Sequence, residues 1–85
     1  LMASFEVRLP AFGMQMQFAY IVEWHVAEGQ SIAEGDNLVS IETDKVETVM
    51  ESPAAGVVVE IRGKPEDEVE VGALLAIINS NGPGQ

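Results

Sequence analysis

The chain has 85 residues, and its 14 acidic residues against four Lys and Arg give a formal net charge of −10 at pH 7. This length suffices for one small domain, and a hydrophobic content of 47% argues against intrinsic disorder. The charge excludes nucleic acid as a partner, because phosphate binding needs clustered Lys and Arg, and mutual repulsion favours a monomer. The absence of cysteine excludes disulfides and thiolate metal sites, and no apolar run is long enough to span a membrane.

The beginning of the chain predicts two strands separated by a loop. Residues 1–4 are expected to be a disordered start or a remnant of recombinant expression. Residues 5–9 alternate strictly between apolar and polar side chains before Pro10 ends the strand. Residues 11–17 show no clear period, which indicates a loop. Residues 18–26 are rich in aromatic and β-branched residues and predict the second strand.

Two turns follow the second predicted strand, at residues 28–31 and 34–37, and they flank a short strand around Ile32. A glycine in each turn supplies the positive φ that such turns need. Before these turns, Trp24 is predicted to be a partly buried anchor whose indole N–H needs an acceptor. His25, the only histidine, is expected to be an ordinary surface strand residue, because no nucleophile or paired carboxylate accompanies it in the sequence.

A hairpin pattern surrounds Lys45, one of the two lysines in the chain. Val39 and Ile41 alternate with Ser40 and Glu42 before Lys45, and Thr48 and Met50 alternate with Glu47 and Glu51 after it. This period of two predicts two strands with one buried face and Ser40 on the other, water-exposed face. Thr43-Asp44 provides turn chemistry between them. Lys45 is therefore expected to project into solvent from the tip of a hairpin. A lysine in such a place is ordinary, so its position alone does not assign a function.

An internal repeat relates the two halves of the chain. Two similar halves predict an all-β fold of two short antiparallel sheets, related by an approximate two-fold axis and packed as a flattened barrel or sandwich. The lysine hairpin is expected at one end and the two chain ends at the other. The repeat also lays Gly29 on Glu66, so the turn at residues 64–68 is predicted to be built differently. A shift of 37 residues lays Ile21 on Val58, Ile32 on Val69, Gly35 on Gly72 and Leu38 on Leu75.

The segment around Lys45 resembles the lipoyl-attachment segment of lipoyl domains, which belong to the E2 acyltransferase subunits of 2-oxo acid dehydrogenase complexes. The segment reads Glu42-Thr43-Asp44-Lys45-Val46 and is followed by Ser52-Pro53-Ala54-Ala55-Gly56. The resemblance covers residues 5–79 and implies the barrel-sandwich hybrid fold, with residues 80–85 as the start of a flexible linker. Ala19 departs from the glycine that is frequent in the family. Further similar residues are Leu9-Pro10, Gly13-Met14, Ile21-Val22-Glu23-Trp24, Glu28-Gly29, Glu34-Gly35-Asp36 and Val71-Gly72-Ala73-Leu74-Leu75.

The resemblance implies a carrier with no catalytic side chain and no metal. Lipoate would be attached by an amide to Lys45, with Asp44 and Val46 recognised by a lipoyl ligase. The domain would shuttle acyl groups and reducing equivalents among the thiamine-diphosphate-dependent dehydrogenase (E1), the E2 catalytic core and the dihydrolipoyl dehydrogenase (E3). The parent protein would be a dihydrolipoamide acyltransferase, in the bacterial cytoplasm in preference to the mitochondrial matrix. The residues expected to take part in partner recognition are Glu42, Thr43, Glu47, Gly13, Met14 and Gln15.

Two other functions stay open at this point. A biotin carrier domain of a carboxylase has the same architecture, but its lysine usually lies between two methionines, whereas Asp44 and Val46 flank Lys45 here. A cofactor-free β-sandwich interaction module would need no modified lysine at all. The sequence leaves the 2-oxo acid unspecified, since pyruvate, acetoin-type and branched-chain complexes share these motifs.

Overall fold

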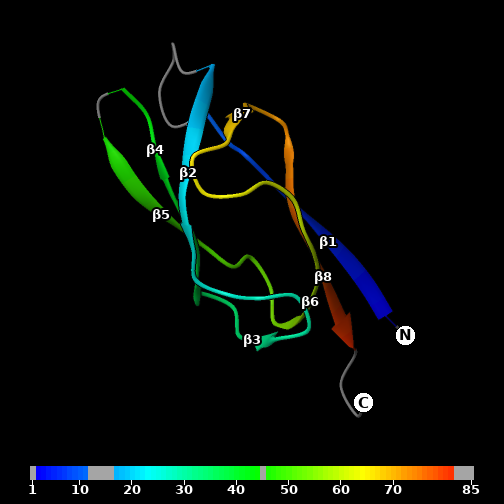
Figure 1. Cartoon of the computed structure of the whole chain (residues 1–85). Helices are drawn as coiled ribbons and strands as arrows, with labels where there is room; N and C mark the ends of the chain where they lie inside the picture. Colours follow the sequence, from blue (N-terminus) through cyan, green and yellow to red (C-terminus); the bar gives the residue numbers. More distant parts are fainter. Residues whose placement is uncertain (1, 12–16, 45, 82–85) are drawn as a thin grey trace.

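The computed structural model describes residues 2–11, 17–44 and 46–81, and within these ranges every regular element is a β-strand (Figure 1). The prediction of an all-β fold is confirmed. The described residues include no helix that is long and apolar enough to cross a membrane. The strands are β1 Met2–Arg8, β2 Phe18–Trp24, β3 Ser31–Ile32, β4 Asn37–Glu42, β5 Glu47–Glu51, β6 Gly56–Ile61, β7 Glu68–Glu70 and β8 Leu74–Asn81.

The strands form two antiparallel four-stranded sheets packed face to face as a flattened sandwich. Sheet A has the order β1-β8-β6-β3, and sheet B has the order β5-β4-β2-β7. One hydrophobic core lies between the sheets, with Trp24 and Met50 among the partly buried residues packed against it. The largest fully buried side chains are Leu9, Ile21, Leu38, Ile41, Leu75, Ile78, Val39 and Val58.

The predicted two-fold relation between the halves is present in the strand order and in the register. Each strand of sheet A has its counterpart in sheet B four strands earlier or later in the chain. The order β1-β8-β6-β3 thereby corresponds to the order β5-β4-β2-β7. The irregularity in the register of β2–β4, after Ile21, recurs in β6–β8 after Val58. Two halves with the same pattern of apolar residues thus adopt the same pairing. Under the shift of 37, the pairs Tyr20–Glu42, Ile21–Ile41 and Trp24–Val39 correspond to Val57–Asn79, Val58–Ile78 and Ile61–Ala76.

The turn at residues 64–68 corrects one prediction, because it is built in the same way as its counterpart at residues 27–31. Glu66 has a φ of 78°, which matches the φ of 90° at Gly29. The N–H of each donates to a strand carbonyl in the other half, Glu66 to Ile21 and Gly29 to Val58, both at 2.6 Å. Backbone hydrogen bonds between this turn and β2 therefore hold Glu66 in a left-handed conformation, which costs about 1 kcal/mol.

Ala19, the other departure from the family pattern, leaves the local structure intact. It lies inside β2, paired with Val69 of β7, and its side chain is fully buried. The corresponding residue in the other half is Gly56, where a Cβ atom would come within 2.2 Å of the carbonyl oxygen of Asn79. The two halves thus differ in how closely the neighbouring strand approaches at this position.

The strands at the two chain ends extend beyond the predicted boundaries. The sequence predicted a disordered start at residues 1–4 and a linker from residue 80, but residues 2–4 pair with residues 79–81 in the β1–β8 ladder. The sequence could not indicate this pairing, because the two segments are at opposite ends of the chain. Residues 1 and 82–85 lie outside the described ranges.

The connection between β1 and β2 breaks the symmetry. Leu9 and Ser52 occupy equivalent positions in the two halves. The Leu9 N–H donates to the Ala73 carbonyl, in the turn after β7, at 3.0 Å, and the Ser52 N–H donates to the Asp36 carbonyl, in the turn after β3, at 2.8 Å. Leu9 and Ser52 are 43 residues apart in the sequence, whereas equivalent positions in β2 and β6 are 37 residues apart. The first connection is therefore six residues longer than its counterpart, and it includes the predicted recognition loop.

Candidate functional site

The connection between β4 and β5 is a short turn closed by Thr43. The last strand pair is Glu42 opposite Glu47, which leaves residues 43–46 as the turn. The Thr43 N–H donates to the Val46 carbonyl at 2.8 Å, and the Val46 N–H donates to Thr43 Oγ1 at 3.2 Å. The Thr43 hydroxyl also donates to the same Val46 carbonyl at 3.3 Å. The predicted turn is present, and both the backbone and the Thr43 side chain fix it, whereas the prediction assigned the side-chain bond to Asp44.

Position 45 is flanked by two exposed residues. Asp44 is exposed, and Val46 is 54% exposed, which is the largest exposure among the described large hydrophobic residues. Lys45 itself lies outside the described residues, as do Gly13, Met14 and Gln15 of the first loop, so the predictions for these four remain predictions. In Figure 1 the β4–β5 hairpin points to the upper left, whereas β1 begins and β8 ends at the lower right.

The base of the hairpin is anchored in the core through β4. Leu38, Val39 and Ile41 of this strand are fully buried. β4 is an inner strand of sheet B, paired with β5 on one side and β2 on the other. The turn at residues 43–46 is therefore mounted on a part of the sheet that has little freedom to move, because packed interiors are dense and resist deformation.

Ser40 corrects a prediction, because it is 6% exposed and does not lie on a water-exposed face. Its hydroxyl oxygen is 2.7 Å from Nε2 of His25, which follows the end of β2. His25 is exposed, as predicted, but the sequence missed its partner, which is 15 residues away. A serine and a histidine at this distance suggest a nucleophile and a base, yet the burial of Ser40 closes that side chain to a substrate. The contact therefore satisfies a buried hydroxyl.

The predicted partner-recognition residues of the hairpin lie together. Glu42 and Glu47 are directly opposite each other and both are exposed, while Thr43 is half-buried between them in the chain. Like charges placed directly opposite on two strands are destabilising. The ion pairs of the described residues, Arg8–Glu6 and Arg62–Glu60, involve other strands. The hairpin thus presents two carboxylates beside the turn that form no ion pair with another described residue.

The site offers a place of attachment and shows no catalytic machinery of its own. Within the described part of the chain, no group of His, Asp and Glu residues could hold a metal ion. Trp24 also has a structural role, since its indole N–H donates to the Gly63 carbonyl at 3.2 Å, as predicted for a partly buried anchor.

Comparison with known proteins identifies a family. The profile of the biotin/lipoyl family, described as "Biotin-requiring enzyme", matches residues 5–78. The solution structure of the lipoyl domain of the 2-oxoglutarate dehydrogenase complex from Azotobacter vinelandii is similar, with a TM-score of 0.76 and 30% sequence identity. The similarity covers 91% of this chain and 98% of that domain.

Two curated relatives are much longer than this chain. The dihydrolipoyllysine-residue acetyltransferase component of the pyruvate dehydrogenase complex of Corynebacterium glutamicum is 36% identical over 75 residues, which are 88% of this chain and 11% of that protein. The corresponding succinyltransferase component of the 2-oxoglutarate dehydrogenase complex of Bartonella vinsonii subsp. berkhoffii is 39% identical over 75 residues, 88% of this chain and 18% of that protein. The chain thus spans less than a fifth of either relative.

Proposed function

This chain belongs to the biotin/lipoyl family, and from that premise we propose that it is a lipoyl carrier domain with the cofactor joined by an amide to Lys45. The observation that carries the proposal is the closed turn of residues 43–46, on a buried strand, at the position of the lysine. A carrier lysine must be accessible to a ligase and mounted on a rigid support. The exposure of Asp44 and Val46 and the burial of β4 support both conditions.

The choice of lipoate over biotin is supported by the relatives and by the residues that flank the lysine. The similar proteins are named as dihydrolipoyllysine acyltransferases or as a lipoyl domain. Asp44 and Val46 stand where a biotin carrier usually has methionines. An apolar side chain that is 54% exposed at the edge of a turn contributes little to folding. Val46 is thereby suited to contact a lipoyl ligase, with Asp44 on the other side of the lysine.

The residues of this chain hold and present the cofactor. Thr43 fixes the turn through its three hydrogen bonds with Val46, which ties the residues on the two sides of Lys45 together. Glu42 and Glu47 set a negative charge at the base of the turn. The dithiolane of a bound lipoyl group supplies the acyl-carrying and redox chemistry.

The partners follow from the same proposal. The domain would visit an E1 dehydrogenase, an E2 catalytic core and an E3 dihydrolipoyl dehydrogenase, after loading by a lipoyl ligase. Tethering to a larger acyltransferase would raise the effective concentration of the cofactor at each active site. The expected location is the bacterial cytoplasm. Recognition by these partners would use Glu42, Thr43 and Glu47, together with the first loop at Gly13, Met14 and Gln15.

Intact-mass measurement tests the assignment. The chain is expressed with a lipoyl ligase and lipoate, and separately with a biotin ligase and biotin. A lipoyl-sized gain that disappears in Lys45→Arg and persists in Lys64→Arg is the expected result, since the chain has these two lysines. A biotin-sized gain would assign the domain to a carboxylase. No gain under either condition would leave an interaction module and contradict the proposal.

A further inference from the structure

The two sheets differ strongly in the charge of their strands. The strands of sheet B contain six glutamates and no Lys or Arg, whereas those of sheet A contain two glutamates and one arginine. All six glutamates of sheet B are exposed. Both ion pairs of the described residues use the arginines Arg8 and Arg62, neither of which is in sheet B. The outer face of sheet B is therefore strongly negative, and none of the ion pairs among the described residues compensates this charge.

An aromatic pair lies on β2 within this negative face. Phe18 and Tyr20 are 40% and 41% exposed, while Ala19 and Ile21 alternate with them and are buried in the core. The two rings are 5.5 Å apart between centroids and meet edge to face at 88°. The geometry is favourable for the pair itself, yet it leaves much of both rings in water. Exposed aromatic residues are enriched at protein interfaces.

Carboxylates surround the aromatic pair on the same face, because residues directly opposite on neighbouring strands point to the same side of a sheet. Glu70 is opposite Phe18. A row that includes Tyr20 crosses all four strands of the sheet and reaches the base of the Lys45 turn. From β7 to β5 this row consists of Glu68, Tyr20, Glu42 and Glu47. We call Phe18, Tyr20, Glu42, Glu47, Glu68 and Glu70 the acidic-aromatic face.

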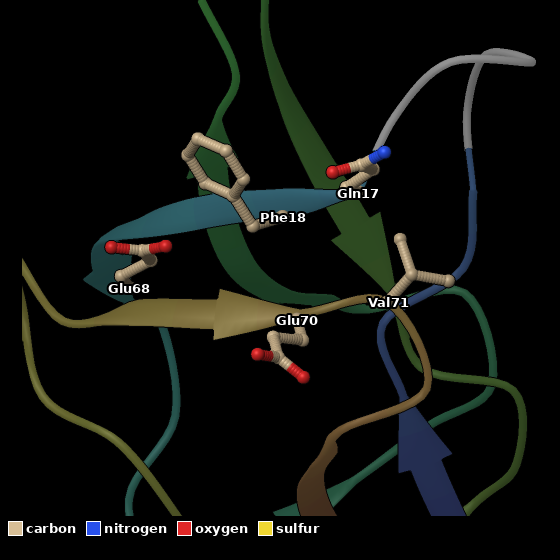
Figure 2. Close-up of a pocket in the computed structure, with 5 residues that line it drawn as sticks. All are labelled: Gln17, Phe18, Glu68, Glu70 and Val71. Atoms are coloured by element: carbon tan, nitrogen blue, oxygen red, sulfur yellow. The ribbon is translucent and has the colours of Figure 1, made fainter.

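A hollow at one side of this face combines apolar and acidic residues. Figure 2 shows its five lining residues at the beginning of β2 and along β7. Phe18 and Val71 provide apolar surface, and Glu68, Glu70 and Gln17 provide acceptors. A side chain with an alkyl stem and a cationic head matches this combination. Arginine and lysine are the two side chains of this kind. Arginine fits better, because its planar guanidinium stacks on aromatic rings and binds a carboxylate with two hydrogen bonds, whereas lysine ends in a compact ammonium group.

We propose that the acidic-aromatic face is a docking surface for a protein partner that presents arginine, with one guanidinium against Phe18 and the carboxylates of Glu68 and Glu70. Charge complementarity defines the partner as a basic surface. The directly opposed glutamates Glu42 and Glu47 reduce the stability of the sheet, and a basic partner would neutralise them. The face adjoins the turn at residues 43–46, so a docked partner would have that turn beside it. The proposal does not depend on the cofactor.

The test is an NMR titration of the unmodified chain with hexaarginine amide at low ionic strength, with hexalysine amide as the comparator. The expected result is a set of amide shifts confined to residues 17–20, 42, 47 and 68–71, with changes in the ring signals of Phe18 and Tyr20, and tighter binding of the arginine peptide. Shifts of equal size at Glu6 and Glu60 of sheet A would indicate general attraction to an acidic protein and would overturn the proposal.

Matched variants locate the contact. Glu70→Gln is expected to weaken hexaarginine binding about threefold, and Phe18→Leu is expected to do the same and to remove the preference over hexalysine. Glu34→Gln removes the same charge from a distant exposed turn, and Phe5→Leu alters an aromatic ring that is also 40% exposed. Both controls should leave the preference unchanged. Equal effects of the controls and the test variants would contradict the assignment of the hollow.

Discussion

Sheet A and sheet B share strand order, register and turns, but they present different surfaces to solvent. The inward-facing positions of both sheets are filled by similar aliphatic residues, such as Leu38 and Leu75, because the common core imposes the same requirement on each half. The outward positions of sheet B hold glutamates and two aromatic rings, and sheet A lacks this pattern. The comparison teaches that the repeat specifies the fold, while the differences between the halves indicate function.

The ends of the sheets extend the comparison. In sheet B, Glu42 and Glu47 are joined through the Lys45 turn. In sheet A, the equivalent pair is Asn79 and Ser4, next to the chain ends, and the Ser4 hydroxyl donates to Asn79 Oδ1 at 2.8 Å. One end of the molecule thus has repelling carboxylates and the other has a neutral hydrogen bond. The carboxylates belong to the end where we propose that the cofactor is attached.

The largest expected effect tests whether equivalent core positions in the two halves contribute equally to the free energy of unfolding. Leu38→Ala and Leu75→Ala each remove a fully buried side chain at equivalent positions. Each is expected to lower the free energy of unfolding by about 3 kcal/mol. Urea denaturation followed by Trp24 fluorescence measures both. A large loss in one variant and a negligible loss in the other would show that the halves are not energetically equivalent.

A smaller effect is expected where the halves differ in backbone spacing. Gly56→Ala brings a Cβ atom against the Asn79 carbonyl, so strands β6 and β8 must move apart. The free energy of unfolding should fall by about 2 kcal/mol, within the range for overpacking. The matched change is Ala19→Gly on β2, with an expected loss of about 1 kcal/mol from backbone entropy. The idea of a closer approach at Gly56 fails if Gly56→Ala is neutral in the same denaturation experiment.

The smallest effect concerns the two equivalent turns. Glu66→Gly relieves the left-handed strain that Gly29 avoids. The free energy of unfolding should rise by about 0.5 kcal/mol, which is the strain minus the added freedom of glycine in the unfolded chain. The reciprocal variant, Gly29→Glu, should lose a similar amount. Thermal unfolding of both variants measures the difference, and a destabilised Glu66→Gly would show that the glutamate side chain contributes more than its backbone costs.

Much of this fold was predictable from the sequence, because apolar residues recur regularly along several strands and again between the two halves. Alternation predicted the first strand and the two strands of the Lys45 hairpin, aromatic and β-branched composition predicted the second strand, and the repeat predicted the relation between the sheets. The burial of Ser40 was not predictable, since it involves His25, which follows the end of the neighbouring strand. The Glu66 turn was misjudged because residue preference was weighed without the hydrogen bonds that hold the turn in place. The row through Tyr20 was missed because it requires the register of four strands.

The central claim is that the turn of residues 43–46 presents one defined position for modification. The most direct measurement is the rate of loading by lipoyl ligase, followed by intact mass, for the native chain and for a variant that combines Asp44→Lys with Lys45→Asp. This variant keeps the composition and the Thr43–Val46 hydrogen bonds while moving the amine by one residue. The account predicts rapid loading of the native chain and at least tenfold slower loading of a variant with unchanged stability. Equal rates would contradict it.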